Sequence, residues 1–338
     1  MSRTLIISDI HHRWVQAQHL IDTVPHDKCI LLGDYFDQFN DTPDHAHNTV
    51  VWLKELVLTN PKIVPLIGNH DQYYFWPWYG YFRGSGYSEA KNHAIRKVLN
   101  QDDVAKFKFF TVDQGYVLSH AGLTCHIWKE FIRDEDDDVV TTLDFFTEVL
   151  AERVDRNLNM IGMNRPAELF MAGWDRGGSC RHGGMTWCDW GSFAPIKGIN
   201  QIFGHSPHIF PEILTQKKKG DIKRYIAPNF CNKKINFKDV TSINFDLDTH
   251  SNHYAIIEDG VVNIYDATTK ENVNDIKLTV PKKDDTVIIE SLKEEMRREA
   301  LVGSTVTMPT DKDWKKIISD LENGKAKWTQ VKDSELTD

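Results

Sequence analysis

The stretch Leu5-Ile6-Ile7-Ser8-Asp9-Ile10-His11-His12 stands near the start of the chain, and the interpretation of the other segments depends on it. Its apolar run has the character of a buried β-strand and ends in an acid, with a histidine two residues later. Because residues i and i+2 of an extended strand share a face, Asp9 and His11 are expected to point toward one place. A carboxylate oxygen beside an imidazole nitrogen suits a divalent transition metal. The competing interpretation is that Asp9 caps the next helix and His11 lies in a loop, since short motifs often match by chance.

The same arrangement recurs twice in the next 60 residues, where an apolar run ends in polar residues. Residues 29–32 stop at Gly33-Asp34, and residues 63–67 stop at Gly68-Asn69-His70-Asp71. Segments with helical spacing of apolar residues separate the runs, which predicts βαβ units and a largely parallel sheet. Ligands of such sheets bind beyond the carboxyl ends of the strands, so the polar segments are expected to converge.

Two later histidines occupy the same kind of position. A hairpin predicted over residues 106–119 leads into His120, and an apolar run at residues 201–203 leads into Gly204-His205. Asn69 and His70 are expected in an extended or tightly turned loop, where adjacent side chains point apart. Further strands are predicted at residues 222–226, 242–245, 254–257 and 261–265.

Composition and charge narrow the class of protein. The chain has 338 residues with 41% hydrophobic content, which is typical of a globular protein. Its net charge of -9 makes a broad basic surface for duplex nucleic acid unexpected, although a local basic groove stays open. Five scattered cysteines predict free thiols in a reducing compartment, and neither a signal segment nor a membrane-spanning run is present. We therefore expect a cytoplasmic protein that acts away from membranes.

We predict an α/β domain over residues 1–275 and a charged, helical C-terminal extension over residues 276–338. The aromatic run at residues 73–82 has two interpretations: a lid or stacking wall over the site, or an apolar cover on the core. Residues 173–193 are rich in Gly, Trp and Arg and lack periodicity, which predicts an ordered, functional loop.

Five segments together resemble the calcineurin-like metallophosphoesterases. Each places metal-ligand residue types after a predicted strand, and they are Asp9-Ile10-His11, Gly33-Asp34-Tyr35-Phe36-Asp37, Gly68-Asn69-His70-Asp71, Ser119-His120-Ala121-Gly122 and Gly204-His205-Ser206-Pro207. The resemblance spans residues 4–270 and includes residues 244–249, which are similar to a strand end of the protein-phosphatase branch. It implies a four-layer α/β sandwich of two mixed β-sheets flanked by helices.

The resemblance also implies a dinuclear site with two divalent metal ions. Its ligands would be Asp9 and His11 on the first ion, Asp34 as the bridge, and Asn69, His120 and His205 on the second. Manganese is favoured, with iron, zinc or nickel as alternatives. A metal-bridging hydroxide would attack the phosphorus, and His70, oriented by Asp37, would protonate the leaving oxygen.

The segment around His205 distinguishes between branches of the family. Nuclease-like members carry Gly-His-x-His, whereas here Ser206-Pro207 follows His205, and His208 stands one place too far along. This favours a resemblance to the Ser/Thr protein phosphatase and diadenosine-tetraphosphatase-like branch of bacterial or phage type. The chain departs from that branch as well, because Gln38-Phe39 replaces Arg-Gly, Asp71 replaces Glu and His12 replaces Gly.

Substrate phosphate still requires a cationic partner, and the planar fork of arginine matches phosphate oxygens. Arg176, in the segment Gly173-Trp174-Asp175-Arg176-Gly177-Gly178, is predicted to bind the substrate together with Asn69. Arg181 and His182 are the alternatives.

The predicted function is a metal-dependent phosphatase for a phosphorylated substrate, which is a phosphoprotein, a nucleotide or a dinucleoside polyphosphate. A phosphodiesterase or nuclease of the same superfamily is the first alternative. A binding module that has lost catalysis is the second.

Overall fold

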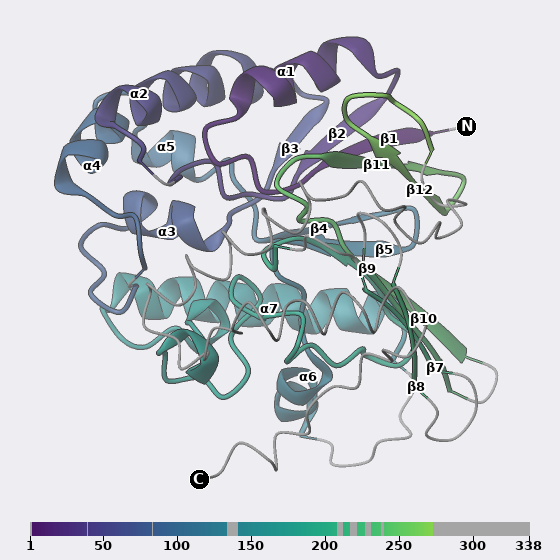
Figure 1. Ribbon diagram of the computed structural model, residues 1–338. Coiled ribbons are helices and arrows are strands. Elements are labelled where there is room, and N and C mark those ends of the chain that lie inside the picture. Colours follow the sequence, from purple (N-terminus) through teal and green to yellow (C-terminus); the bar gives the residue numbers. More distant parts are fainter. Residues whose placement is uncertain are drawn as a thin grey trace, which may run out of the picture. The chain divides into compact units, whose positions relative to one another are not determined.

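Two mixed β-sheets flanked by helices make up the part of the chain that the computed structural model describes (Figure 1). The described residues are 2–272 apart from 39, 83, 134–140, 208–211, 217–221, 227–230 and 238–239, and within 208–241 only the strand backbone is described. All of them belong to the unit Met1–Leu278. His208 and the predicted extension at residues 276–338 lie outside the described residues, so the domain boundary stays a prediction.

The first sheet carries the first three predicted site segments at the ends of neighbouring parallel strands. In spatial order its strands are β12 (Val261–Asp266), β11 (His253–Glu258), β1 (Arg3–Ile7), β2 (Lys28–Leu31) and β3 (Ile63–Pro65). β1, β2 and β3 pair in parallel, whereas β11 and β12 are antiparallel additions. The parallel strands are connected by α1 (Trp14–Thr23), α2 (Pro43–Trp52) and the π-helical η1 (Leu53–Val57). The predicted βαβ units are therefore confirmed.

The second sheet holds the two later histidine segments. Its strands are, in spatial order, β4 (Phe110–Asp113), β5 (Tyr116–Ser119), β6 (Asn200–Phe203), β10 (Val240–Asp246), β9 (Cys231–Phe237), β7 (Glu212–Gln216) and β8 (Ile222–Ile226). The β4–β5 hairpin confirms the predicted pairing, although its first strand begins at Phe110 and not at residue 106. β5 and β6 are parallel neighbours, so His120 and His205 follow at the same edge of the sheet.

Helices cover the outer face of each sheet in Figure 1. Besides α1 and α2, they are α3 (Asn69–Phe75), α4 (Glu89–Arg96), α5 (Gln101–Val104), α6 (Cys125–Ile132) and α7 (Leu143–Gly162), with 3-10 turns at η2 (Glu168–Phe170) and η3 (Trp174–Arg176). Residues 173–193 otherwise consist of turns and loops, as the missing periodicity predicted.

The alternation of side chains along β1 separates two hydrophobic clusters. Leu5 and Ile7 belong to the larger cluster beneath the helices, while Ile6 packs between the sheets with Leu118 of β5 and Ile202 of β6. Successive side chains of a strand point to opposite faces, so both faces of β1 are buried. This double burial explains why the run is continuously apolar.

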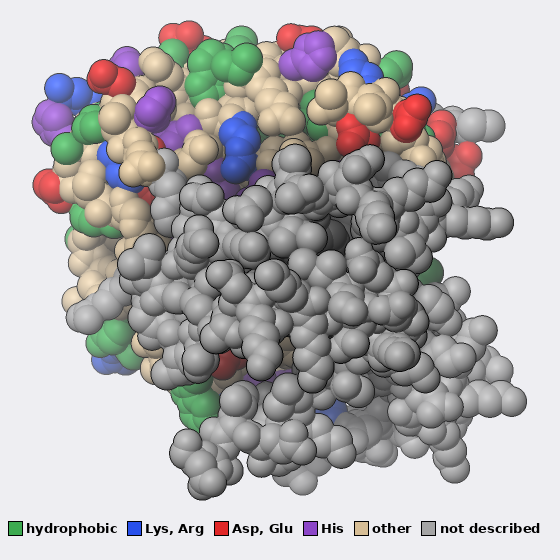
Figure 2. All heavy atoms as spheres, in the orientation of Figure 1, with side chains coloured by type: hydrophobic (Ala, Val, Ile, Leu, Met, Phe, Trp, Pro, Cys, Tyr) green, Lys and Arg blue, Asp and Glu red, His purple; other side chains and the backbone are tan. Residues whose placement is uncertain are grey.

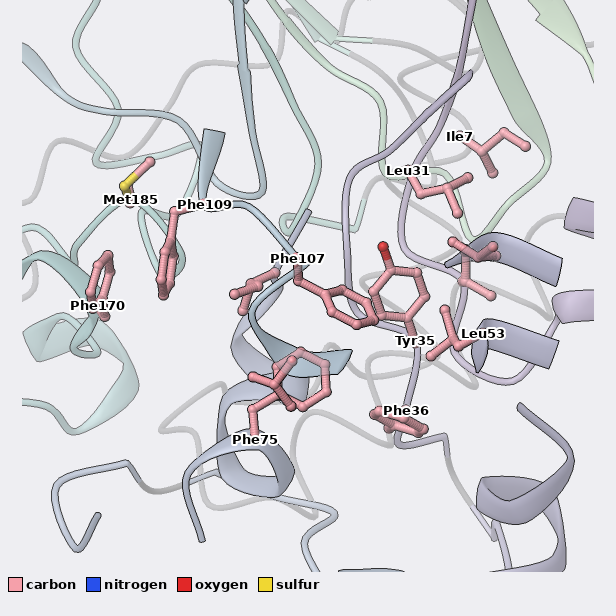
Figure 3. Close-up of a cluster of buried hydrophobic side chains, with 14 of the residues drawn as sticks. Ile7, Leu31, Tyr35, Phe36, Leu53, Phe75, Phe107, Phe109, Phe170 and Met185 are labelled. Carbon is pink, nitrogen blue, oxygen red and sulfur yellow. The ribbon is translucent and has the colours of Figure 1, made fainter. Parts of the chain in front are cut away.

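Figure 3 shows part of the larger cluster, in which Ile7 and Leu31 lie near a group of aromatic rings from the loops and helices. Phe75 of the aromatic run contacts Phe107, with ring centroids 4.8 Å apart. Five of the eight aromatic side chains in residues 73–82 are buried, although Trp78 is 54% exposed. The run is thus mainly a cover on the core, which was one of its two interpretations.

None of the helices among the described residues combines the length and the apolar composition of a membrane span. Figure 2 shows basic, acidic and histidine side chains interspersed over the described surface around α1, α2 and α4. Mixed charge of this kind is typical of a solvated face.

Candidate metal centre

The predicted ligands follow the strands directly and have unusual backbone conformations. Four of them adopt left-handed φ angles: Asp9 (40°), His11 (41°), Asp34 (54°) and His205 (78°). Such angles are uncommon for residues other than glycine, and they persist where the surrounding structure holds them, often at functional sites. Asp9 and His11 were expected to share a face of the strand, and this is wrong, because β1 ends at Ile7 and both residues lie in the turn that follows.

Glycines and an acid hold the second and third loops together. Gly33 has a φ of 102°, and a Cβ atom there would overlap the backbone of Gly68. The carboxylate of Asp71 accepts hydrogen bonds from the backbone N–H groups of Gly68 (2.8 Å), Asp34 (2.9 Å) and Tyr35 (2.8 Å). Asp71 therefore fixes the loop that carries Asp34 relative to the start of α3.

Asp9, His11 and Asp34 form the first potential metal-binding group, with ligand atoms within 4.8 Å of one another. His11 Nδ1 donates to backbone carbonyls, 3.0 Å from the oxygen of Phe36 and 2.6 Å from that of Asp37. This fixes the tautomer and leaves Nε2 as the ligand atom. His11 Nε2 lies 3.6 Å from Asp34 Oδ2.

Asp34, His120 and His205 form the second group, so Asp34 is common to both. His120 Nδ1 donates to the carbonyl of Leu32 (3.0 Å), and its Nε2 lies 3.4 Å from Asp34 Oδ2. Asn69 Oδ1 lies 2.8 Å from His120 Nε2 and 2.9 Å from His205 Nδ1. The structure thus brings the six predicted ligands together, with Asp34 common to both groups.

Burial and mutual charge perturb these groups strongly. Burial raises the pKa of Asp9 to about 6. Burial also acts to raise the pKa of Asp34, but His120 and His70 hold it well below its usual range. The same pairing, working against burial, raises the pKa of His120 to about 10. Bound cations would take the place of these protons, since metal ligands bind in their deprotonated forms.

The donor set fits divalent ions. Burial, with His120 and Arg176 nearby, holds the pKa of His205 well below its ordinary value, so the imidazole is neutral and able to bind a metal. Its buried Nε2 has no hydrogen-bond partner among the described residues, and Asp189 Oδ1 is 3.9 Å away. Two ligand atoms about 2.1 Å from one ion are about 3.0–3.4 Å apart at tetrahedral or octahedral angles. The separations of Asp34 Oδ2 from His120 and His11, 3.4 and 3.6 Å, are close to that range.

His70 and Asp37 form a pair beside the shared carboxylate. His70 Nδ1 lies 3.0 Å from Asp37 Oδ2, and the backbone N–H of His70 donates to Asp34 Oδ1 (2.9 Å). Burial acts to lower the pKa of His70, but Asp34 and Asp37 together raise it above its ordinary value. The imidazolium form is therefore favoured, as a proton donor requires.

Asn69 and His70 do not lie in a loop, contrary to the sequence-based expectation, because they are the first residues of α3. Gly68 is the N-cap residue of α3. Adjacent helical residues are rotated by about 100° about the axis, so the two side chains still diverge, for a different reason.

Arg176, the predicted phosphate ligand, lies near His205 and is 45% exposed. Asp189 holds it in a bidentate ion pair, with Nε 3.0 Å from Oδ2 and Nη2 2.6 Å from Oδ1. The alternative His182 stacks on His126 with ring centroids 4.3 Å apart. Arg181 is close enough to His126 to help burial lower the pKa of that histidine.

Three residues near the site were missed by the sequence analysis. Asp248 is buried, and burial together with Asp9 raises its pKa to about 6. Its place in residues 244–249 was a signal that could have identified it. Asp189 gave no comparable signal. Lys91 gave no such signal either, because a lysine on a short polar helix is expected to be solvated.

Comparison with known proteins gives one family. The family model described as calcineurin-like phosphoesterase matches residues 2–209. No curated protein matches the sequence.

The similar solved structures include a cold-active protein-tyrosine phosphatase of a psychrophilic Shewanella species (12% identity, 81% of each chain covered, TM-score 0.44). They also include a metallophosphoesterase from Sphaerobacter thermophilus (14% identity, 96% of this chain and 99% of that chain, TM-score 0.36). A third is a protein serine/threonine phosphatase from Saccharomyces cerevisiae (11% identity, 82% of this chain and 81% of that chain, TM-score 0.37). These likenesses are weak, so the family assignment rests on the family model.

Proposed function

Because the chain belongs to the calcineurin-like phosphoesterase family, we propose that it is a dinuclear metal-dependent phosphatase acting on phosphate monoesters. The observation that carries the proposal is the pair of potential metal-binding groups that share Asp34. A carboxylate common to two ligand groups is the arrangement that a bridged pair of ions needs.

Six side chains would hold the two ions. Asp9 and His11 would bind the first, Asp34 would bridge, and Asn69, His120 and His205 would bind the second. The bound ions would supply an activated water and neutralise charge on the phosphoryl oxygens. We favour manganese, because carboxylate, amide and imidazole ligands without thiolate suit it, with iron, zinc or nickel as alternatives.

The remaining residues act on the substrate directly. His70, held at Nδ1 by Asp37, donates its Nε2 proton to the leaving oxygen. An alkoxide is a poor leaving group, so this proton transfer matters most for alkyl phosphates. Arg176 binds the phosphate through its planar guanidinium, with Asp189 keeping the fork in one orientation.

These residues indicate a phosphorylated substrate without selecting one class. We propose a phosphoprotein, a nucleotide or a dinucleoside polyphosphate as substrate, in the cytoplasm. A phosphodiesterase or nuclease is the alternative, and the net charge of -9 together with the missing Gly-His-x-His segment counts against it. A binding module without catalysis would have no use for the His70–Asp37 pair.

The test uses the full chain reconstituted with manganese. p-Nitrophenyl phosphate, bis-p-nitrophenyl phosphate and a dinucleoside tetraphosphate are each assayed with the wild type and with Asp34→Asn as the metal-deficient control. We expect the monoester to be hydrolysed fastest and the control to be inactive.

Each other result identifies an alternative. Faster turnover of the diester would replace the phosphatase proposal with a diesterase. A preference for the tetraphosphate would make the enzyme a dinucleoside polyphosphate hydrolase. Inactivity on all three substrates, with metal bound, would leave the binding module.

A further inference from the structure

A series of buried, mostly charged side chains begins at the His70–Asp37 pair and continues through Lys91 and Asp41. Asp37 Oδ1 accepts hydrogen bonds from the hydroxyl of Tyr74 and from Lys91 Nζ, both at 2.6 Å. Lys91 Nζ also lies 2.9 Å from both carboxylate oxygens of Asp41. His12 Nε2 lies 2.9 Å from Asp41 Oδ2 and completes the series. The residues come from α3, α4 and two separate loops.

These side chains are unusually buried for a set that is mostly charged. The side chains of Lys91, Asp37 and His12 are at most 4% exposed, and that of Asp41 is 9% exposed. Lysine is almost never fully buried unless it is paired, and removing an ammonium from water is costly. A buried lysine with two carboxylate partners therefore has a defined geometry, which a flexible surface lysine lacks.

The hydrogen bonds to Asp37 determine how the proton donor, His70, is oriented. The two donors on Oδ1 fix the plane of the Asp37 carboxylate, and its other oxygen then meets His70 Nδ1 at 3.0 Å. With Nδ1 held in this way, Nε2 is the ring nitrogen that can face a substrate. If Oδ1 lost its donors, the carboxylate could rotate and the imidazole would lose its fixed direction.

We propose that Lys91 and Tyr74 are positioning residues for proton transfer: they lock the Asp37 carboxylate so that His70 is aimed at the leaving oxygen. Neither residue touches the substrate or a metal ligand in this role. Asp41 binds the ammonium of Lys91 as its second carboxylate partner, and His12 contacts Asp41 in turn. The inference rests on the proposed function, because it assumes that His70 is the acid.

The competing explanation is that Lys91 only ties α4 to the loop that carries Asp37 and Asp41. A tie of this kind would support the fold, and its loss would affect every substrate equally. A positioning role acts through His70 alone, so its loss should depend on the leaving group and should vanish when His70 is absent.

The experiment compares Lys91→Met, which keeps the length of the side chain but removes its charge, in the wild-type and His70→Asn backgrounds. Lys54→Met is the matched control, because Lys54 Nζ also bridges elements, lying 2.9 Å from Asp103 Oδ2, and takes no part in the site. kcat and KM are measured on an alkyl phosphate and on p-nitrophenyl phosphate, together with the metal content of each variant.

For Lys91→Met we expect kcat on the alkyl phosphate to fall about 10–100-fold, by analogy with the loss of a residue that orients a metal ligand. The loss on p-nitrophenyl phosphate should be smaller, with KM and metal content unchanged. In the His70→Asn background the substitution should cause no further loss. Lys54→Met should match the wild type.

Equal losses on both substrates, or a further loss in the His70→Asn background, would show that Lys91 is only structural and would overturn the inference while leaving the phosphatase proposal intact. If His70→Asn itself costs both substrates equally, the acid assignment fails, and the inference fails with it.

Should Lys91→Met not fold, Tyr74→Phe decides, because it removes a single hydroxyl from Asp37 Oδ1. It should give the same leaving-group pattern with a smaller loss, and Lys91→Arg should retain more activity than Lys91→Met. A uniform loss in Tyr74→Phe would again overturn the inference.

Discussion

Replacing Asp34 by Asn tests the dinuclear site most directly, because one residue is proposed to serve both ions. Asp34 Oδ2 lies 3.6 Å from His11 Nε2 in one group and 3.4 Å from His120 Nε2 in the other. The amide keeps an oxygen that can accept the 2.9 Å hydrogen bond from the backbone of His70. We therefore expect the fold to survive, at a cost of about 1 kcal/mol for a weakened hydrogen bond.

The loss of metal affinity should be far larger than the loss of folding stability. Losing an orienting partner of a metal ligand already costs about 10–100-fold in affinity, so losing a direct ligand should cost each ion about 100-fold or more. This corresponds to about 2.7 kcal/mol per ion. The substitution also removes one of the two carboxylates, Asp9 and Asp34, among the proposed ligands. Both ions should be lost together.

The assay is metal content per chain after reconstitution with manganese and gel filtration, followed by turnover. The wild type should retain two ions, Asp34→Asn none, and His11→Gln one. Asp113→Asn is the matched control, because its carboxylate, at the end of β4, binds Lys28 of β2 and Thr4 of β1 and takes no part in the proposed site. It should leave both ions in place. Two ions with normal turnover in Asp34→Asn would refute the bridging role.

Three further results are expected. Arg176→Lys keeps the charge but loses the bidentate fork, so KM and the inhibition constant for inorganic phosphate should rise with metal content unchanged; the assignment is wrong if Arg181→Lys does this instead. Gly33→Ala should lower stability by about 1–3 kcal/mol, seen as a lower Tm, because its φ of 102° is strained for alanine and the Cβ overlaps Gly68. Burial lowers the pKa of His253 to about 4, although Asp266 acts to raise it. Between pH 6.5 and pH 4, His253 is therefore protonated in the unfolded chain but neutral in the folded chain. Wild-type stability should therefore fall as the pH drops from about 6.5 to about 4. His253→Gln should lose this part of the pH dependence, and thermal unfolding at several pH values measures the difference.

The strand ends of the site could be predicted because the signal is local. A strand buried on both faces, such as β1, must be continuously apolar, so the first polar residue after it marks where the strand meets solvent or a ligand. Asp9, Asp34, Asn69, His120 and His205 all stand within a few residues of such a point. Their convergence then follows from the parallel order of neighbouring strands.

The local backbone conformation within the site was harder to predict from the sequence. Asn69 begins a helix although its last three positions, residues 73–75, are aromatic, and aromatic residues are weak helix formers. The available signal was a cap: Asp71 stands three residues after Gly68 and accepts its backbone N–H. The strands β7 and β9 were not predicted, because their sequences carry no clear strand pattern. Residues 231–237 are mostly polar, and their pairing with β10 and β7 is a tertiary property that periodicity does not report.

The partners of the proton donor show where sequence information ends. Asp37 meets His70, Tyr74 and Lys91 across 33, 37 and 54 residues of chain, and none of these separations is a repeat or a motif. In sequence, a lysine on a short polar helix is interpreted as a solvated residue, and Lys91 becomes exceptional only through its burial between two carboxylates. Ligands at strand ends are constrained by the sheet, whereas Tyr74 and Lys91, the residues proposed to position the proton donor, lie on the helices α3 and α4. Substitutions on α4 should therefore alter catalysis without altering any residue that touches metal or phosphate.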